Sequence, residues 1–330
     1  MRFFHVPAVA LTALLTTIFA AFPAHLSSQT LQYERDESFL PIPAVSPPYW
    51  EMNGTAVSPE GRSVFATRRF DPPIIEMDAK TGEILREFGS GLLAWPHGIH
   101  VDDEGYIWVA DATVGDPPRL GLMGPIPLAV KAGRGHQVHK LSPDGEVLMS
   151  LGTKGVPGKG GTHFNAPTDI VVDPESGDIF VSDGHNVNTN ARIVKFSKDG
   201  KFLKEWGGLG WAPGQFNTPH AIDLDSQGRL FVADRGNGRI QIFDQDGRFL
   251  EEWRHLGGRS GIAITPDDIM FTTGSNSIMI VNAKDGSILG EIREGINAEG
   301  VAVDDYGNVY ASEVFDRSVK KFTRKLNLRH

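Results

Sequence analysis

Two histidines in this chain occupy matching places in two nearly identical stretches. His97 lies in "PHGIHVDDEGYIWVAD" and His220 lies in "PHAIDLDSQGRLFVAD". A third related stretch, "AEGVAVDDYGNVYASE", holds Glu299 at the same place. Two imidazoles and one carboxylate with an open face form a catalytic zinc arrangement, and the same donors also bind non-haem Fe²⁺. We therefore predict a metal site at His97, His220 and Glu299, with Zn²⁺ as the expected ion and Fe²⁺ as the alternative.

Charged side chains recur at the end of the same stretches. The repeat normally ends in an aspartate that we expect to be structural, as at Asp111, Asp183 and Asp234. The first copy has Arg68 there, and Arg235 directly follows Asp234. An arginine near a metal is suited to bind a substrate carboxylate through two parallel hydrogen bonds. His185 follows the element "SDG" and, with a reference pKa near neutrality, is a candidate general base. Arg68, His185 and Arg235 are therefore the predicted catalytic residues.

The stretches that carry these residues are copies of one repeat. Six copies begin at Met52, Pro96, Pro167, Pro219, Arg259 and Ala298. Each copy has an alternating apolar run, a turn rich in Asp and Gly, and a second run, which is a hairpin pattern. Two further runs follow most copies, so the unit has four strands, as in a β-propeller blade. We predict an all-β, six-bladed β-propeller whose missing last strand comes from residues 31–37.

This architecture predicts where the metal-binding side chains meet. The first strand of every propeller blade lines a central channel, so matching residues form a ring around it. The ring residues, in blade order, are Asn53, His97, Thr168, His220, Ser260 and Glu299. The metal-binding types fall on alternate blades, about a third of a turn apart, and should converge on one point.

Composition limits the partners and the location. The chain has 330 residues, 40% hydrophobic and 22% charged, which is typical of a globular protein. A net charge of −9 argues against nucleic acid, and the absence of cysteine excludes disulfides and thiolate ligands. Residues 1–28 have the order of a secretory signal peptide, which leaves 29–330 as the propeller. We expect a secreted or periplasmic monomer without a membrane span in the mature chain.

The blades resemble NHL repeats, and the ordered set of motifs resembles one family more closely. The stretches "PHGIHVDDEGYIWVAD", "HFNAPTDIVVDPESGDIFVSDG", "PGQFNTPHAIDL" and "VADRGNGRIQIF" are similar to peptidyl-α-hydroxyglycine α-amidating lyases (peptidylamidoglycolate lyases). The likeness covers most of the mature chain and is densest from Trp95 to Trp253. It implies a six-bladed propeller with a catalytic zinc on three histidines and a structural calcium. It also implies cleavage of a carbinolamide to an amide and glyoxylate.

The resemblance also assigns the metal-site residues, and some of these positions hold a different residue from the one in the family. Two of the family's zinc histidines match His97 and His220, and the third position is Glu299. The aspartate that binds calcium in the family matches Gly300, which removes a ligand, although Ile99 could offer its carbonyl. Zinc is therefore expected and calcium is not.

The resemblance also assigns roles outside the metal site. The family's two carboxylate-binding arginines match Arg68 and Arg235, and its catalytic tyrosine matches His185. The predicted function is an exported, metal-dependent carbon–nitrogen lyase that acts on an α-hydroxyglycine-type substrate with a carboxylate. One alternative is a non-enzymatic NHL propeller that binds a peptide, glycan or protein at the channel mouth. Another is a calcium-dependent lactonase, which is disfavoured because such channels hold their metal mainly by Glu, Asp and Asn.

Overall fold

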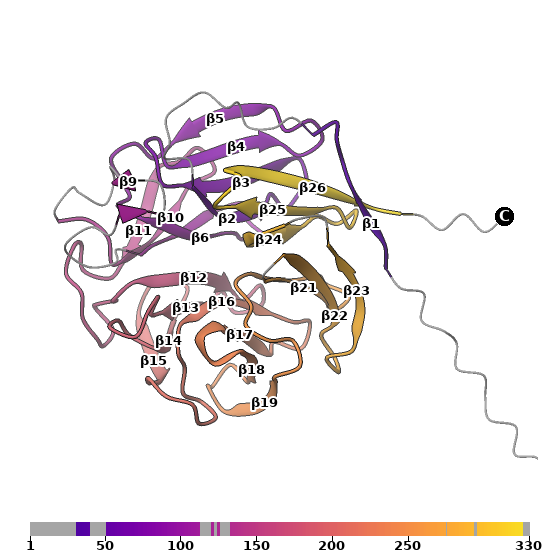
Figure 1. Ribbon diagram of the computed structural model, residues 1–330. Helices are drawn as coiled ribbons and strands as arrows, with labels where there is room; N and C mark the ends of the chain where they lie inside the picture. The colour runs from indigo at the N-terminus through magenta and orange to yellow at the C-terminus, as the bar shows by residue number, and fades with distance from the viewer. Residues whose placement is uncertain are drawn as a thin grey trace, which may run out of the picture.

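Six antiparallel sheets of four strands each surround a common centre (Figure 1). The computed structural model describes residues 31–39, 51–112, 120–121, 124–125, 133–274, 276–293 and 296–325. Apart from a 3-10 turn at Arg235–Asn237, the elements of these residues are all strands, which confirms the all-β, six-bladed propeller. Over the same residues, no helix is long and apolar enough to cross a membrane. The predicted signal peptide, residues 1–28, and most of 113–135 lie outside the described part.

The strands follow the predicted repeat. Blade 1 consists of β2 (Met52–Val57), β3 (Ser63–Arg68), β4 (Ile74–Asp78) and β5 (Ile84–Phe88), and blade 2 of β6 (Pro96–Val101), β7 (Ile107–Asp111), β10 (Gln137–Leu141) and β11 (Val147–Leu151). Blade 3 consists of β12 (Pro167–Val172), β13 (Ile179–Asp183), β14 (Arg192–Phe196) and β15 (Phe202–Gly207), and blade 4 of β16 (Pro219–Leu224), β17 (Leu230–Asp234), β18 (Arg239–Phe243) and β19 (Phe249–Trp253). Blade 5 consists of β20 (Ile262–Ile264), β21 (Ile269–Gly274), β22 (Ser277–Asn282) and β23 (Ile288–Ile292). Blade 6 consists of β24 (Ala298–Val303), β25 (Val309–Glu313), β26 (Ser318–Arg324) and β1 (Tyr33–Arg35), and the pair β8 (Leu120–Gly121) and β9 (Gly124–Pro125) stands apart.

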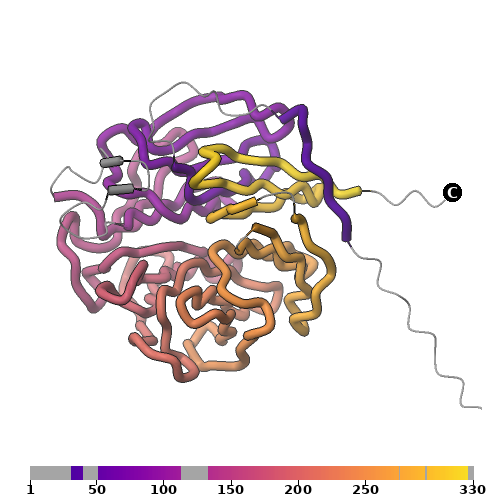
Figure 2. Tube along the Cα trace, in the orientation of Figure 1, coloured from indigo at the N-terminus to yellow at the C-terminus, as the bar shows by residue number. Residues whose placement is uncertain are grey.

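The ring is closed by the N-terminal segment. Strand β1 pairs antiparallel with β26, with Tyr33 opposite Arg324 and Arg35 opposite Phe322. Figure 2 shows this indigo segment crossing the yellow strand that comes from the other end of the chain. The prediction that residues 31–37 supply the outer strand of the last blade is therefore confirmed.

The hydrophobic core lies between the faces of neighbouring blades. The second strands β7, β13, β17 and β25 are buried at every residue, because both faces of each sheet are covered. One cluster packs Trp108 of blade 2 against Val181 and Phe196 of blade 3. Outer strands such as β15 expose much of their length to solvent. The six inner strands are thereby held in fixed positions around the channel.

The aspartates that end the repeat are structural, as predicted. Asp111 accepts hydrogen bonds from the backbone N–H groups of Ala94 and Trp95, just before the inner strand of its blade. Asp234 accepts one from Asn217 and forms a fully buried ion pair with Arg239, with Nε 2.8 Å from Oδ2. These carboxylates fix the loops that lead into the channel-lining strands.

Candidate functional site

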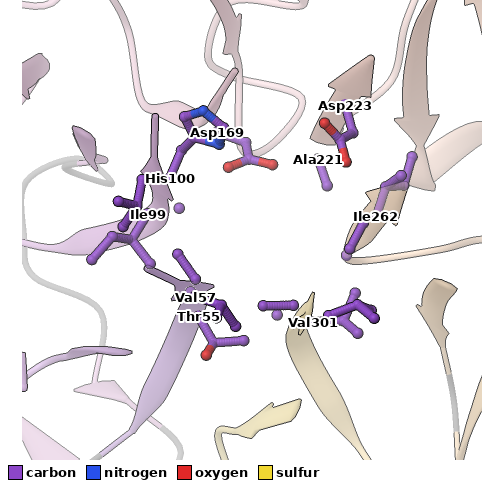
Figure 3. A pocket seen from close by; sticks show the side chains of 18 of the residues that line it. Thr55, Val57, Ile99, His100, Asp169, Ala221, Asp223, Ile262 and Val301 are labelled. Carbon is purple, nitrogen blue, oxygen red and sulfur yellow. The ribbon is translucent and has the colours of Figure 1, made fainter. Parts of the chain in front are cut away.

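The predicted ring of side chains lines one cavity. All six ring residues border a central cavity of about 380 Å³, namely Asn53, His97, Thr168, His220, Ser260 and Glu299. Figure 3 looks into this cavity and shows Asp169 and Asp223 on its wall with their carboxylates directed inward. The register of the six copies is therefore confirmed by the geometry of the channel.

Both ring histidines are tied to the next blade through the same nitrogen. Nδ1 of His97 lies 2.7 Å from the carbonyl oxygen of Thr168, and Nδ1 of His220 lies 2.8 Å from that of Ser260. A carbonyl accepts only, so Nδ1 must carry the proton and Nε2 must present a lone pair. Neither Nε2 atom has a hydrogen-bond partner within the described structure, although both are buried. This is the tautomer and the exposure of the lone pair that a metal ligand requires.

A third imidazole joins these two. His97, His185 and His220 each offer a ring nitrogen, and the three atoms lie within 4.8 Å of one another. The ring centroid of His185 is 4.9 Å from that of His97 and 5.4 Å from that of His220. Glu299 is not in this group, but its Oε2 lies 3.4 Å from Nε2 of His220. His97 and His220 come from blades 2 and 4, and the third imidazole comes from blade 3 between them, which the predicted ring of inner-strand residues does not include.

The backbone after β13 explains how blade 3 reaches the channel. Gly184 has φ 140°, and a Cβ there would lie 1.5 Å from the carbonyl oxygen of Asn190. Only glycine therefore fits this turn without displacing the chain. The backbone N–H of Gly184 donates to the carbonyl of Ala166, which anchors the turn beside the inner strand. His185 follows immediately and points to His97 and His220.

The two ring histidines are uncharged in the fold. Burial, with a smaller contribution from Arg69, lowers the pKa of His97 to about 3. Burial and then Arg235 lower the pKa of His220 well below its usual value. Neutral imidazoles are the form that binds metal, since a protonated ring has no lone pair to offer.

Glu299 and Arg235 form a charged pair beside the histidines. Nη1 of Arg235 donates to Oε2 of Glu299 at 3.4 Å. The Arg235 side chain is 31% exposed, so part of its guanidinium faces solvent. Arg235 begins the 3-10 turn after β17, where Gly236 allows close approach, since a Cβ there would be 2.5 Å from the Asn217 carbonyl.

The prediction that Arg68 faces the channel mouth is wrong. Its guanidinium is 1% exposed, pairs with Glu87 of the outer strand β5 at 2.8 Å, and donates to the Pro72 carbonyl. The register explains this placement, because Arg68 stands opposite Met52 as Asp234 stands opposite Pro219. Arg68 therefore occupies the position of the structural aspartates, and a shift of one residue reverses the direction of a side chain in a strand.

Arg69 occupies the position that matches Arg235. Each follows the last residue of a second strand, and the backbone N–H groups donate to the carbonyls of Glu51 and Thr218 respectively. Arg69 forms a buried ion pair with Glu51, and its guanidinium lies 4.4 Å from the ring centroid of Trp95. In the aligned copies Arg69 follows Arg68 as Arg235 follows Asp234. This comparison selects Arg69 from the sequence as the counterpart of Arg235.

A side chain at position 300 would not fit, which bears on the calcium expectation. A Cβ on Gly300 would lie 2.5 Å from the carbonyl oxygen of Asn53 and 3.0 Å from the backbone nitrogen of Thr55. The aspartate implied by the resemblance therefore has no room here without movement of blade 1. Deeper in the channel, burial raises the pKa of Asp169 to about 8 and that of Asp223 to about 7. Both accept backbone hydrogen bonds from the next blade, at Ile222 and Ile264 respectively.

The donor set fits a divalent transition metal. Two buried imidazole nitrogens lack partners, a third imidazole lies beside them, and a carboxylate is within reach. Nitrogen and oxygen donors of this kind suit zinc and ferrous iron better than calcium, which prefers six to eight oxygens. Side chains from four blades, His97, His185, His220 and Glu299, could hold such an ion.

Comparison with known proteins supports the resemblance seen in the sequence. The family described as NHL repeat matches residues 216–243. The chain is 38% identical over 172 residues to the peptidylglycine alpha-amidating monooxygenase of Rattus norvegicus, which covers 50% of this chain and 15% of the relative. It is 35% identical over 167 residues to a probable peptidyl-alpha-hydroxyglycine alpha-amidating lyase of Caenorhabditis elegans. That alignment covers 49% of this chain and 41% of the relative. The chain thus spans less than half of either relative.

Solved structures support the architecture. The structure of streptogramin B lyase matches with a TM-score of 0.59 and 18% identity, covering 90% of this chain and 99% of the other. At that identity the match concerns the fold alone. The chain is thus similar in sequence to an amidating monooxygenase and to a probable amidating lyase, and in fold to streptogramin B lyase.

Proposed function

We propose that this protein is a metal-dependent carbon–nitrogen lyase that cleaves an α-hydroxyglycine-type carbinolamide to an amide and glyoxylate. The observation that carries the proposal is the pair of unpartnered Nε2 atoms on His97 and His220, next to two arginines and two further proton-accepting groups. Relatives whose names include amidating lyase, from Caenorhabditis elegans and Drosophila melanogaster, support the same reaction class.

The chain's own residues divide the tasks of binding and orientation. Arg235 is the better placed cation for the substrate carboxylate, because its side chain is 31% exposed beside the partly exposed Glu299, whereas Arg69 is buried in its pair with Glu51. His97 and His220 would hold the ion, with Glu299 or His185 as the third ligand. Zinc, when bound there, supplies a Lewis acid that polarises the hydroxyl oxygen of the substrate. Trp95, whose ring centroid is 5.6 Å from that of His185, forms an apolar wall beside the reacting carbon.

The reaction requires one proton to be moved within the site. A base takes the hydroxyl proton, the carbon–oxygen double bond forms as the carbon–nitrogen bond breaks, and the proton goes to the amide nitrogen. No proton or other atom is gained or lost overall. The base is His185 or Glu299, whichever does not hold the ion.

The direct test is glyoxylate release from N-benzoyl-α-hydroxyglycine by the zinc-loaded protein. We expect release faster than spontaneous breakdown, one benzamide per glyoxylate, loss on chelation and recovery with added Zn²⁺. N-benzoylglycine, which lacks the hydroxyl group, is the matched substrate control and should not react. A protein that binds one equivalent of metal but gives only the spontaneous rate would instead be a non-enzymatic binding propeller.

Export and a monomeric state are also proposed. Both rest on the sequence, through the signal-like residues 1–28 and the single predicted ring. Determination of the N-terminus of protein secreted by the native cell, followed by sedimentation of that protein, would test both.

A further inference from the structure

The sequence resemblance places the third metal ligand at Glu299 and the base at His185, and the distances in the structure favour the reverse. We infer that His185 completes the ligand set with His97 and His220, and that Glu299 is the base. The assignment of the base rests on the proposed function, whereas the ligand assignment does not. The inference starts from the mutual distances, since the ring nitrogens of the three histidines lie within 4.8 Å and Glu299 is outside that group.

The two departures from the family pattern compensate each other. Position 299 has lost an imidazole and position 185 has gained one, so the site still contains three. Because the turn at Gly184 is fixed by contact with Asn190, the gained imidazole is delivered to the same end of the channel as the ring histidines. A change at one position alone would leave either two or four imidazoles.

Electrostatics favour the same division. Three neutral imidazoles leave the full charge on a bound cation, whereas a carboxylate ligand neutralises part of it. Glu299 is also held by Arg235, since Nη1 lies 3.4 Å from Oε2, and this contact competes with metal coordination by the same oxygen. The same Oε2 atom of Glu299 lies 3.4 Å from Nε2 of His220, so the carboxylate is beside the histidine cluster.

A carboxylate in that position can carry the proton through the whole reaction. Glu299 takes the proton from the substrate hydroxyl and becomes neutral. As the carbon–nitrogen bond breaks, the same proton passes to the leaving amide nitrogen and the carboxylate is restored. Arg235 contacts both Glu299 and, in the proposed complex, the substrate carboxylate, so the base and the substrate share one anchor.

Metal content of single variants tests the ligand assignment without any assay of turnover. After dialysis against Zn²⁺, elemental analysis should find one equivalent in the parent and in Glu299→Gln, and at least tenfold weaker binding in His185→Ala and His185→Gln. His255→Ala is the matched control, because that imidazole is exposed and bonds the Gly286 carbonyl away from the channel. Replacing the metal by Co²⁺ should leave the visible spectrum of Glu299→Gln close to that of the parent, because its nitrogen ligands are unchanged.

A compensating variant strengthens the test. Adding Glu299→His to His185→Ala should restore one equivalent of zinc, since a third imidazole returns to the ring. Glu299→Gln should keep the metal but lose about 10²–10⁴-fold in glyoxylate release, the range for removal of a general base.

Each outcome bears on one assignment. Full zinc in folded His185→Ala and His185→Gln would overturn the ligand assignment, and loss of zinc in Glu299→Gln would return that residue to the ligand set. Unchanged turnover in Glu299→Gln would overturn its role as base. If the parent and Glu299→Gln bind zinc and the His185 variants lose it, but the parent releases no glyoxylate, the proposed function fails while the ligand assignment stands.

Discussion

Replacement of Arg235 by glutamine should weaken binding of glyoxylate, the carboxylate product, without unfolding the protein. The side chain is 31% exposed and its contact in the described structure is with Glu299 at 3.4 Å, so the substitution removes no buried ion pair. A hydrogen bond to a charged group contributes about 1.5–3 kcal/mol. Since about 1.4 kcal/mol is tenfold in affinity, we expect a rise of roughly 10- to 150-fold in Kd.

Calorimetric titration of zinc-loaded protein with glyoxylate measures this effect. Glu299→Gln should shift affinity in the opposite direction, because it removes a negative charge that repels the ligand. Arg248→Gln is the matched control, since Arg248 is 76% exposed and pairs only locally with Asp244. Equal Kd values for the parent and Arg235→Gln would refute the anchoring role, and weaker binding in Glu299→Gln would refute the electrostatic reasoning.

Three further outcomes are expected. In metal-free protein, the free energy of unfolding should peak near pH 6.5. Below that pH the unfolded chain binds protons that the buried histidines cannot bind, so stability falls as the pH falls. Above it the folded chain still holds protons on Asp169 and Asp223, which the unfolded chain has already lost near pH 4, so stability falls until those two groups ionise at about pH 7–8. Urea titrations at a series of pH values would measure both effects; the histidines with lowered pKa are His97, His100, His136, His139 and His220. Gly184→Ala should lower the free energy of unfolding by about 1–3 kcal/mol and weaken zinc binding. Its control is Gly208→Ala, where φ is 147° but the space around an added Cβ is open; this variant should lose less stability and bind zinc as the parent does. Tyr33→Ala removes the ring that lies edge-on to Phe271 at 5.9 Å, and thermal melts should show the protein destabilised by about 1–2 kcal/mol. The control Tyr306→Ala should leave the stability unchanged, because Tyr306 is 79% exposed.

The fold was predictable because its pattern is repeated. Each copy marks one inner strand and one hairpin turn, so an error in one copy is corrected by the others. The closing strand at Tyr33–Arg35 followed from counting, since the last blade lacked a partner for Ser318–Arg324.

The sequence indicated both inner-strand and loop residues of the site, but it predicted how side chains meet only for those on the inner strands. His97 and His220 occupy repeated positions, so their meeting followed from symmetry. His185 and Arg69 come from loops after second strands, where a turn at one glycine or a one-residue difference in register decides the direction. Arg68 was chosen instead of Arg69 although the copies align Arg68 with Asp234 and Arg69 with Arg235.

The pairing of β1 with β26 sets an order of events during synthesis. Residues 33–35 leave the ribosome first among the described strands, yet their partners, residues 322–324, leave it last. Blades 1 to 5 each take their strands from one stretch of the chain and can form while translation continues, whereas blade 6 cannot be completed until the chain is nearly finished. Until then, β1 has no strand to pair with and the ring stays open. A chain that stalls before residue 318 therefore leaves an open ring, with exposed strand edges that invite aggregation.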